Sequence, residues 1–434
     1  MNMKHFTAFI LCVFCTPGIS HADVWTLDRT VSTAVTVSNL VDMEKLNTDS
    51  ARLDAVSAAK GWYPTVSMST GANVVSEVME IKLPFNTIRF GDYDSYDFKL
   101  RFNQLIYDGG RLKALREASQ ERSEMSTFQA DAVSLGVEFQ AKAAFFGVVM
   151  AEKTIEASDQ SINEAINHLR DVNARYREGM ALENEVLSAR LRISQTEMDL
   201  ELRKADLEKA RAAFRRVVGL GHVEEVSVVW NDKEPHTEIT PQVDKVPDTR
   251  PEFRAFDAAL AASEKSAQRA RADIRPSIGL FGAFNYGKPG LDMPANEWMH
   301  YFSGGVLLNW SIWDWGTVSR NVLKEEINQK RTMKTRDDFK RNLTQQLSDA
   351  VTSYNAAKKR EELAGEAAEY ARCQLDLVTS SYREGMVTET DYDNAHTVYT
   401  RIILEKSVAS VAVRLSEAAI EYVLGIHYSG GNNE

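Results

Sequence analysis

The sequence predicts a mainly α-helical protein with a smaller β part, built from one duplicated unit. Tyr176-Arg177-Glu178-Gly179-Met180 recurs letter for letter as Tyr382-Arg383-Glu384-Gly385-Met386, an offset of 206 (382 − 176). The same offset relates Asp108 to Asp314 and Gly110 to Gly316. In each half, apolar and polar residues alternate over a short stretch, and a long stretch without proline comes after it. A repeat at one register indicates two halves of similar architecture.

Strand patterning occurs once in each half. Tyr96, Phe98, Leu100 and Phe102 alternate with polar residues, which is the period of a strand with one apolar face. We expect a β-hairpin at about 64–107 and a second at about 276–313. Tyr63-Pro64 parallels Arg275-Pro276 at an offset of 212, so the strand connections differ in length by six residues, which indicates a loop there.

Long helices follow each hairpin. From Arg111 to Arg177 there is no proline, and apolar or small residues fall at heptad spacing. Such a helix would be about 100 Å long. Glu178-Gly179-Met180 interrupts the pattern, and a second heptad series runs from Val186 to Phe214. Four of the five positions of that series stay apolar or aromatic in the second half, where the exception is Lys406.

These patterns predict the following organisation of the chain. Residues 1–22 form a signal peptide, 23–220 the first repeat, 221–250 an irregular connector that contains prolines, 251–426 the second repeat and 427–434 a tail. The long helical hairpins span 111–218, with a tip near 179, and 317–424, with a tip near 385. A short helix precedes the strands in each half.

Composition limits the possible functions. The apolar run Phe6–Phe14 followed by small residues at Ser20 and Ala22 predicts export, and Cys373 is then the single cysteine of the mature chain. Packing or oligomerisation must therefore stabilise the protein, since no intramolecular disulfide can form. The formal charge of −11 argues against a nucleic-acid partner.

The apolar strand faces require a partner, either a soluble core or lipid. A small soluble sheet is the simpler interpretation for an exported protein. The expected strands are roughly 10 to 13 residues long, which suits tilted membrane strands. Aromatic side chains, typical of membrane interfaces, collect where strands meet helices, at Trp62, Tyr63, Tyr107, Trp310, Trp313 and Trp315. These features favour a transmembrane β part.

A sheet of four strands cannot close in lipid by itself. Each unpaired backbone group at its two edges would cost several kcal/mol. Known small barrels begin at about eight strands, so at least two chains must contribute, and three would supply twelve. The helices far exceed the thickness of a membrane and would project into the periplasm.

The strand exits Tyr107-Asp108-Gly109-Gly110 and Trp313-Asp314-Trp315-Gly316, the segment Arg250-Pro251-Glu252 and the twin Arg-Glu-Gly-Met tips support a family assignment. Over roughly residues 28 to 426 the sequence resembles the TolC family of outer-membrane efflux proteins. The resemblance implies a homotrimer with a 12-stranded barrel in outer-membrane lipid and a periplasmic helical barrel. It also implies two partners, a periplasmic adaptor (membrane fusion) protein and an inner-membrane pump or ABC transporter.

The resemblance further implies roles for the helix tips. Gly179 and Gly385 would make the turns, and Met180 and Met386 would contact the adaptor; the alternative is that all four are structural turn residues. A periplasmic gate would contain the acids and the tyrosine near these turns, Glu185, Tyr382, Asp391 and Asp393.

The gate assignment has an alternative at Asp391. Thr388 and Asp391 have the spacing of a capping box, so Asp391 could serve only the start of its helix. Leu182 occupies the position of Thr388 in the first repeat, so no such box is expected for Glu185. A basic residue sometimes found in the family two positions after the second glycine is Val387 here, which removes one expected ion pair between subunits.

The sequence therefore predicts a passive outer-membrane channel for efflux of small molecules. Type I protein secretion is an alternative, and a soluble periplasmic coiled-coil adaptor or scaffold is a second one. The eight histidines lack the spacing of metal ligands and no phosphate-binding loop is present, so we predict neither enzyme activity nor a cofactor.

Overall fold

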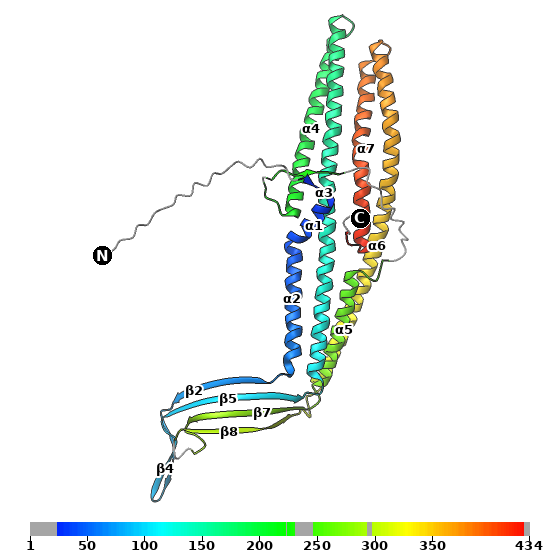
Figure 1. Cartoon of the computed structure of the whole chain (residues 1–434). Helices are drawn as coiled ribbons and strands as arrows, with labels where there is room; N and C mark the ends of the chain where they lie inside the picture. The colour runs from blue at the N-terminus through cyan, green and yellow to red at the C-terminus, as the bar shows by residue number, and fades with distance from the viewer. Residues whose placement is uncertain (1–23, 223, 231–245, 293–296, 429–434) are drawn as a thin grey trace, which may run out of the picture.

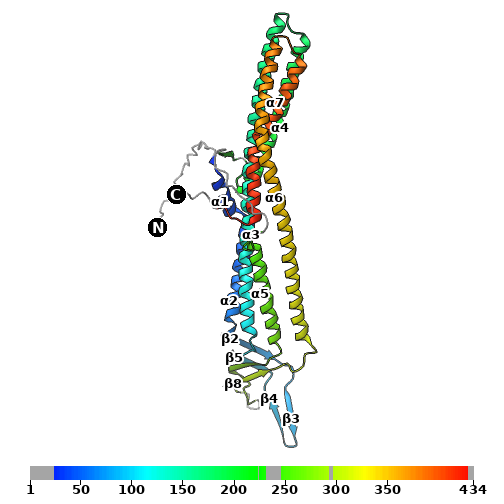
Figure 2. The same ribbon diagram turned by 90° about the vertical axis from the view of Figure 1, so that its right-hand side faces the viewer.

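The computed structural model describes residues 24–222, 224–230, 246–292 and 297–428, and the predicted signal peptide and most of the tail lie outside these ranges. The long helices run along one axis, with a β-sheet at one end and two helical tips at the other (Figure 1). A view turned by 90° shows the helices as one elongated bundle, with helix α1 beside its middle (Figure 2).

The first repeat begins with two helices instead of the single one expected. Helix α1 (Leu27–Val37) and helix α2 (Asn39–Ala59) are separated at Ser38, whose extended backbone interrupts the helical path. The Ser38 side chain accepts a hydrogen bond from the backbone N–H of Val41, so it caps the second helix. A short 3-10 turn, Lys60–Trp62, then leads into the sheet.

The sheet has the strand order β2-β5-β7-β8. These strands are β2 (Thr65–Val74), β5 (Asp94–Tyr107), β7 (Ser277–Lys288) and β8 (Met299–Asn309), and each neighbouring pair is antiparallel. The loop between β2 and β5 contains an additional hairpin, β3 (Met79–Leu83) with β4 (Asn86–Phe90), which extends from the far end of the sheet (Figure 1).

The register of the sheet separates an apolar face from a more polar one. Leu100 lies between Met68 and Phe284, and Phe284 lies opposite Phe302, so one row across the sheet is apolar. The adjacent row on the other face contains Ser67, Arg101, Ala283 and Ser303. Met68 and Phe302 are 66% and 79% exposed in the single chain, so the described residues leave this apolar face uncovered.

Two helical hairpins make up most of the chain. They are α3 (Arg111–Arg177) with α4 (Glu183–Val218), and α6 (Thr317–Arg383) with α7 (Glu389–Leu424). In α3, the small or apolar residues Ser158, Ala165 and Val172 are seven apart and buried. In α7, Lys406, the charged exception in the predicted heptad series, is exposed. Helix α5 (Pro251–Ala272) completes the bundle between α3 and α6.

Arg250 connects the start of α5 to the end of α7. Its side chain is buried, donates to the carbonyl oxygens of Tyr422 and Val423, and forms a two-point ion pair with Glu252 at 2.7 and 2.9 Å. Pro251 occupies the first turn of α5, where a missing N–H costs nothing. The Arg-Pro-Glu segment therefore positions the second repeat against the end of the chain.

The connector is less irregular than the sequence suggested. Within its described part, β6 (Ser227–Val228) pairs in parallel with β1 (Val24–Trp25), the first described element. A proline-containing segment predicts loops but not such long-range pairing. The two strands lie next to helix α1, beside the middle of the bundle (Figure 1).

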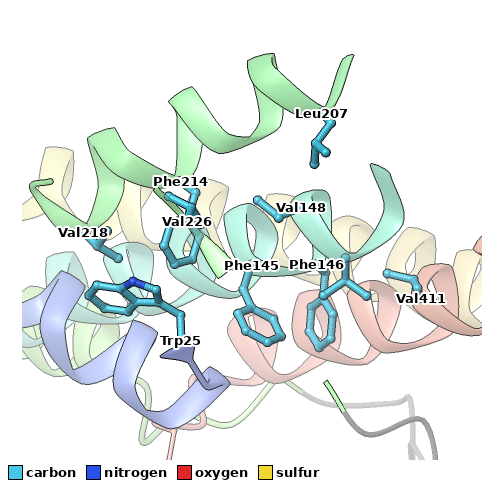
Figure 3. Close-up of a cluster of buried hydrophobic side chains, with 10 residues drawn as sticks. Trp25, Phe145, Phe146, Val148, Leu207, Phe214, Val218, Val226 and Val411 are labelled. Atoms are coloured by element: carbon cyan, nitrogen blue, oxygen red, sulfur yellow. The ribbon is translucent and has the colours of Figure 1, made fainter. Parts of the chain in front are cut away.

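A cluster of buried aromatic side chains lies beside this pair of strands. Phe145 and Phe146 of α3, Phe214 of α4 and Trp25 of β1 are at most 4% exposed, and Val411 of α7 packs with them (Figure 3). The rings of Trp25 and Phe214 meet edge to face at 5.5 Å. This cluster joins both helical hairpins to the N-terminal strand.

One described helix, α3, is long and apolar enough to cross a membrane by length and composition alone. Its apolar segment is 44% buried within the chain, and α3 contributes Phe145 and Phe146 to the core cluster. Core packing therefore accounts for the composition of this helix.

Candidate functional site at the helix tips

The two helix tips reverse the chain in the same way. Gly179 and Gly385 have left-handed φ values of 72° and 76°. The N–H of Met180 donates to the carbonyl of Arg175 at 2.8 Å, which is the bond of a Schellman motif, and Met386 does the same with Ser381. No atom lies within 4 Å of a Cβ added to either glycine, so backbone conformation and not space selects glycine here.

The methionines that follow these turns project into solvent. Met180 is 59% exposed and Met386 is 67% exposed. Each therefore presents a flexible apolar side chain at the extreme end of the bundle.

Tyr382 joins the two tips. Its hydroxyl donates to the Glu185 carboxylate at 2.5 Å, and Arg175 donates to its carbonyl oxygen at 2.6 Å. The Arg175 guanidinium also lies 4.4 Å from the centre of the tyrosine ring. Burial, followed by the hydrogen bonds to Glu185 and Glu389, raises the pKa of Tyr382, so the hydroxyl remains a donor. These contacts connect α6 to α3 and α4.

Two ion pairs also cross between the tips. Arg383 of α6 contacts Asp171 of α3 at 2.5 Å, and Arg192 of α4 contacts Asp393 of α7 at 2.8 Å. Asp393, expected near the gate, is therefore paired with the opposite hairpin. We name the contacts of Tyr382, Arg383 and Arg192 across the two hairpins the tip clamp.

Asp391 caps its own helix. Its carboxylate accepts from the Thr388 N–H at 2.9 Å and from the Thr388 hydroxyl at 2.6 Å, and its own N–H donates to the Thr388 hydroxyl oxygen. These hydrogen bonds lower the pKa of Asp391. The side chain is exposed, so the same carboxylate can also contribute charge to a tip.

Glu185 caps the start of its helix, which the sequence did not lead us to expect. The absence of a hydroxyl at Leu182 suggested that Glu185 would have no capping role. Its carboxylate nevertheless accepts from the Leu182 N–H at 3.3 Å, although Leu182 supplies no side-chain oxygen in return. Glu185 therefore makes half of a capping box and also holds Tyr382.

A buried histidine pair lies beside the tip clamp, and the sequence analysis did not find it. His168 of α3 is within 2.9 Å of the Glu389 carboxylate and stacks on Tyr392 with ring centroids 3.6 Å apart. His396 of α7 is fully buried. The signal was present, because His168 lies three residues after Ala165, and His396 four after Tyr392, on buried helix faces.

The hydrogen bonds of His396 determine its protonation. Arg192 donates to Nδ1 at 2.7 Å, so the neutral ring carries its proton on Nε2, which lies 3.5 Å from the Glu164 carboxylate. Burial first, and the Arg192 and His168 charges second, lower the pKa of His396 to about 3. Burial raises the pKa of Glu164. Both shifts favour the neutral forms of these side chains.

The predicted membrane-interface aromatics lie together at the junction of sheet and helices. Tyr107 ends β5, Trp62 ends the turn before β2, and the rings of Trp313 and Trp315 meet at 5.8 Å before α6. All six predicted side chains are at least 36% exposed, and Trp315 is 80% exposed. They are therefore exposed at the end of the sheet that continues into the helices.

Within the described ranges, no three His, Cys, Asp or Glu side chains are grouped so that they could hold a metal ion. Cys373, the cysteine outside the predicted signal peptide, is exposed on α6.

The chain matches a known protein family. The model of the outer membrane efflux protein family matches residues 34–220 and 243–425. No curated protein sequence matches the chain.

Three solved channels illustrate the structural likeness. The open state of the Neisseria gonorrhoeae MtrE outer membrane channel matches with a TM-score of 0.78 at 18% identity, over 92% of this chain and 89% of that one. VceC of Vibrio cholerae gives 0.75 at 17% identity, over 92% and 96%. The Campylobacter jejuni CmeC channel gives 0.76 at 16% identity, over 92% and 85%. These likenesses establish the fold, and because the family match covers most of its length, the chain belongs to the outer membrane efflux protein family.

Proposed function

We propose that three copies of this protein form the exit duct of a tripartite export system, a passive conduit for small molecules. The sheet is the observation that supports this most strongly. It has one exposed apolar face and continues directly into helices of 67 residues. In lipid its outer strands must be paired, and three copies of the four-stranded sheet would supply a closed barrel of twelve strands.

The helical end would be the periplasmic entrance, and the tip clamp would hold this entrance closed. Tyr382, Arg383 and Arg192 hold the two hairpins of one chain together, and separating the hairpins would break all three contacts. Glu185, Asp391 and Asp393 would place three copies of each acid around one mouth, which would attract cations.

The exposed methionines suit an adaptor that binds the tips. Met180 and Met386 are adaptable apolar side chains next to rigid turns. A periplasmic adaptor would connect this end to an inner-membrane pump. The pump would determine the cargo, so type I protein secretion would use the same duct with a different pump.

Single-channel conductance in planar bilayers tests the proposal. Tyr382→Phe removes the hydroxyl that donates to Glu185, whereas Tyr176→Phe makes the same change at the repeat-related, exposed position. We expect a small cation-selective conductance in the wild type, a larger one in Tyr382→Phe and no change in Tyr176→Phe. Equal conductance in all three proteins would show that Tyr382 does not hold the entrance closed, but it would leave the proposed channel in place. A protein that forms no pores and stays in solution without detergent would overturn the proposed function.

A further inference from the structure

A basic cavity lies between α3 and α5 where these helices meet the sheet, at the lower end of both helices in Figure 1. Its volume is about 350 Å³, and we name it the junction pocket. Five charged side chains line it, four cations and one acid: Lys113, Lys265, Arg271, Arg275 and Glu117. Lysine and arginine offer only hydrogen-bond donors, so the pocket favours an anionic ligand.

Acidic side chains occupy only part of this positive charge. Lys265 pairs with Glu117 at 2.9 Å, and Arg271 pairs with Glu326 of α6 at 3.0 Å. Lys113 has no hydrogen-bond or ion-pair partner among the described residues. Four cations less these two acids leave an excess of two positive charges.

The backbone holds Arg275 at the edge of the pocket. Its guanidinium donates to the carbonyl oxygen of Gly109 at 2.8 Å. A Cβ on Gly109 would lie 2.5 Å from the Cβ of Arg275, so this close approach requires glycine. The carboxylate of the neighbouring Asp108 accepts from the N–H groups of Gly110 and Leu112 at 3.0 and 2.6 Å, so it serves the start of α3.

The duplication shows that the architecture does not require these charges. The repeat counterparts of all five charged lining residues are uncharged. At the offset of 206 they are Ser319 and Leu323, and at the offset of 212 they are Leu53, Ala59 and Tyr63. The charged residues are therefore not needed to start the long helix or to join a helix to a strand.

The pocket lies at the level of the exposed aromatic side chains of the junction. Gly109 follows the end of β5 at Tyr107 by two residues, and Arg275 precedes the start of β7 at Ser277 by two. Aromatic side chains of this kind lie at the headgroup level of a membrane. Basic pockets at that level contact the phosphates of lipid headgroups.

We propose that the junction pocket binds a phosphate group, with Lys113 and Arg271 as its main contacts. The Lys113 ammonium is without an acidic partner in the described chain, and the Arg271 side chain is 61% exposed and keeps N–H groups that Glu326 does not use. The phosphate could belong to a phospholipid headgroup or be free in solution. The pocket lies within one chain, and only the lipid source rests on the proposed function, since it requires the sheet to be in a membrane.

Isothermal titration calorimetry of the detergent-solubilised full chain, at about 50 mM salt where screening is moderate, tests the proposal. The probes are inorganic phosphate, dihexanoylphosphatidylglycerol, and dihexanoylglycerol, which has the same acyl chains but no phosphate. We expect the phosphatidylglycerol to bind and the dihexanoylglycerol not to bind.

Paired substitutions locate the binding. Lys113→Gln with Arg271→Gln removes the two main contacts and should weaken binding about tenfold, because each charged hydrogen bond at an exposed site contributes modestly. The matched control, Arg116→Gln with Arg269→Gln, removes two exposed charges from the same helices outside the pocket and should leave the affinity unchanged. Lys113→Arg with Arg271→Lys keeps both charges and should retain most of the binding.

The probes identify the source of the phosphate. Phosphatidylglycerol that binds roughly tenfold more tightly than inorganic phosphate would identify a lipid ligand, because its glycerol and acyl chains add contacts. Equal affinities would identify free phosphate. No binding of either probe, equal weakening by the pocket and control variants, or equal binding of dihexanoylglycerol would overturn the site.

These outcomes are separate from those for the proposed function. Binding of phosphate to a protein that forms no pores would keep the site and overturn the channel. A conducting channel that binds neither phosphate probe would keep the channel and overturn the site.

Discussion

At the scale of single residues, the hydrogen bonds around the buried His396 require its neutral form. His396 faces Arg192 of α4, Glu164 and His168 of α3, and Tyr392 of its own helix. A protonated imidazole could no longer accept the hydrogen bond from Arg192. The folded tip therefore requires the neutral form of His396.

We predict that acid loosens the start of α7 through His396. The pKa of His396 falls from 6.5 to about 3 on folding. Between these values the unfolded segment binds a proton that the folded one does not, so its free energy of unfolding decreases as the pH falls below about 6.5, by at most about 1.4 kcal/mol per pH unit. Hydrogen exchange of α7 peptides, corrected for intrinsic rates, should show this between pH 7.5 and 5.5.

Two variants control this experiment. His396→Gln keeps an acceptor for Arg192 but does not titrate, so the pH dependence should disappear. His427→Gln changes a half-exposed histidine beyond the other end of α7, where it contacts Glu138, and should leave the pH dependence intact. Persistence of the full pH dependence in His396→Gln would assign it to other groups.

The two interpretations of Asp391 can also be separated. Thr388→Ala removes the capping hydroxyl and should cost about 1 kcal/mol of local helix stability, seen as faster exchange at the start of α7. Asp391→Asn removes the charge. If the acid contributes to a gate, Asp391→Asn should shift the reversal potential of the channel toward weaker cation selectivity, while Thr388→Ala should not. An unchanged reversal potential in both would leave Asp391 as a cap alone.

At the scale of elements, local sequence defines where the helices begin and end. Heptad spacing extends along α3, and α3 and its repeat counterpart α6 both run for 67 residues before a turn with a left-handed glycine. The turn aspartates Asp108 and Asp314 start these helices in the same way. These are short-range effects, which is why the sequence predicted the long helices and their tips.

A pair of glycine substitutions in and after α6 tests the turn conformation. Gly385→Ala should destabilise the tip by about 1–2 kcal/mol, because the open space leaves only the left-handed backbone to oppose the methyl group. Gly365→Ala, inside α6 with equally open surroundings, should stabilise by about 0.5–1 kcal/mol. Local hydrogen exchange measures both changes. Equal signs for the two would contradict the conformational argument.

Other elements escaped the sequence analysis. The hairpin β3–β4 was assigned to a loop, and the pairing of β1 with β6 joins segments about 200 residues apart in the chain. Strands of two to five residues carry too few side chains to show a period. These short strands are recognised by the strands with which they pair and not by a pattern in their own residues.

At the scale of the whole molecule, the apolar face of the sheet must meet lipid if the barrel closes. Phe302→Arg and Ser303→Arg place the same charge on adjacent, opposite-facing residues of β8. In lipid vesicles, Phe302→Arg should destabilise the folded barrel by about 2–4 kcal/mol, and Ser303→Arg by much less. Urea titrations of vesicle-inserted protein measure the difference. Equal losses would indicate that both faces contact water.

The sequence by itself determined the duplication, the long helices, the glycine turns and the alternating strands, because each depends on periodicity or turn chemistry within a few residues. Only the tertiary structure decided that Tyr382 meets Glu185 and that His168 and His396 lie buried beside them. Those contacts depend on the rotation and stagger of one helical hairpin against another. Packing over the whole bundle sets that rotation, and no single segment contains it.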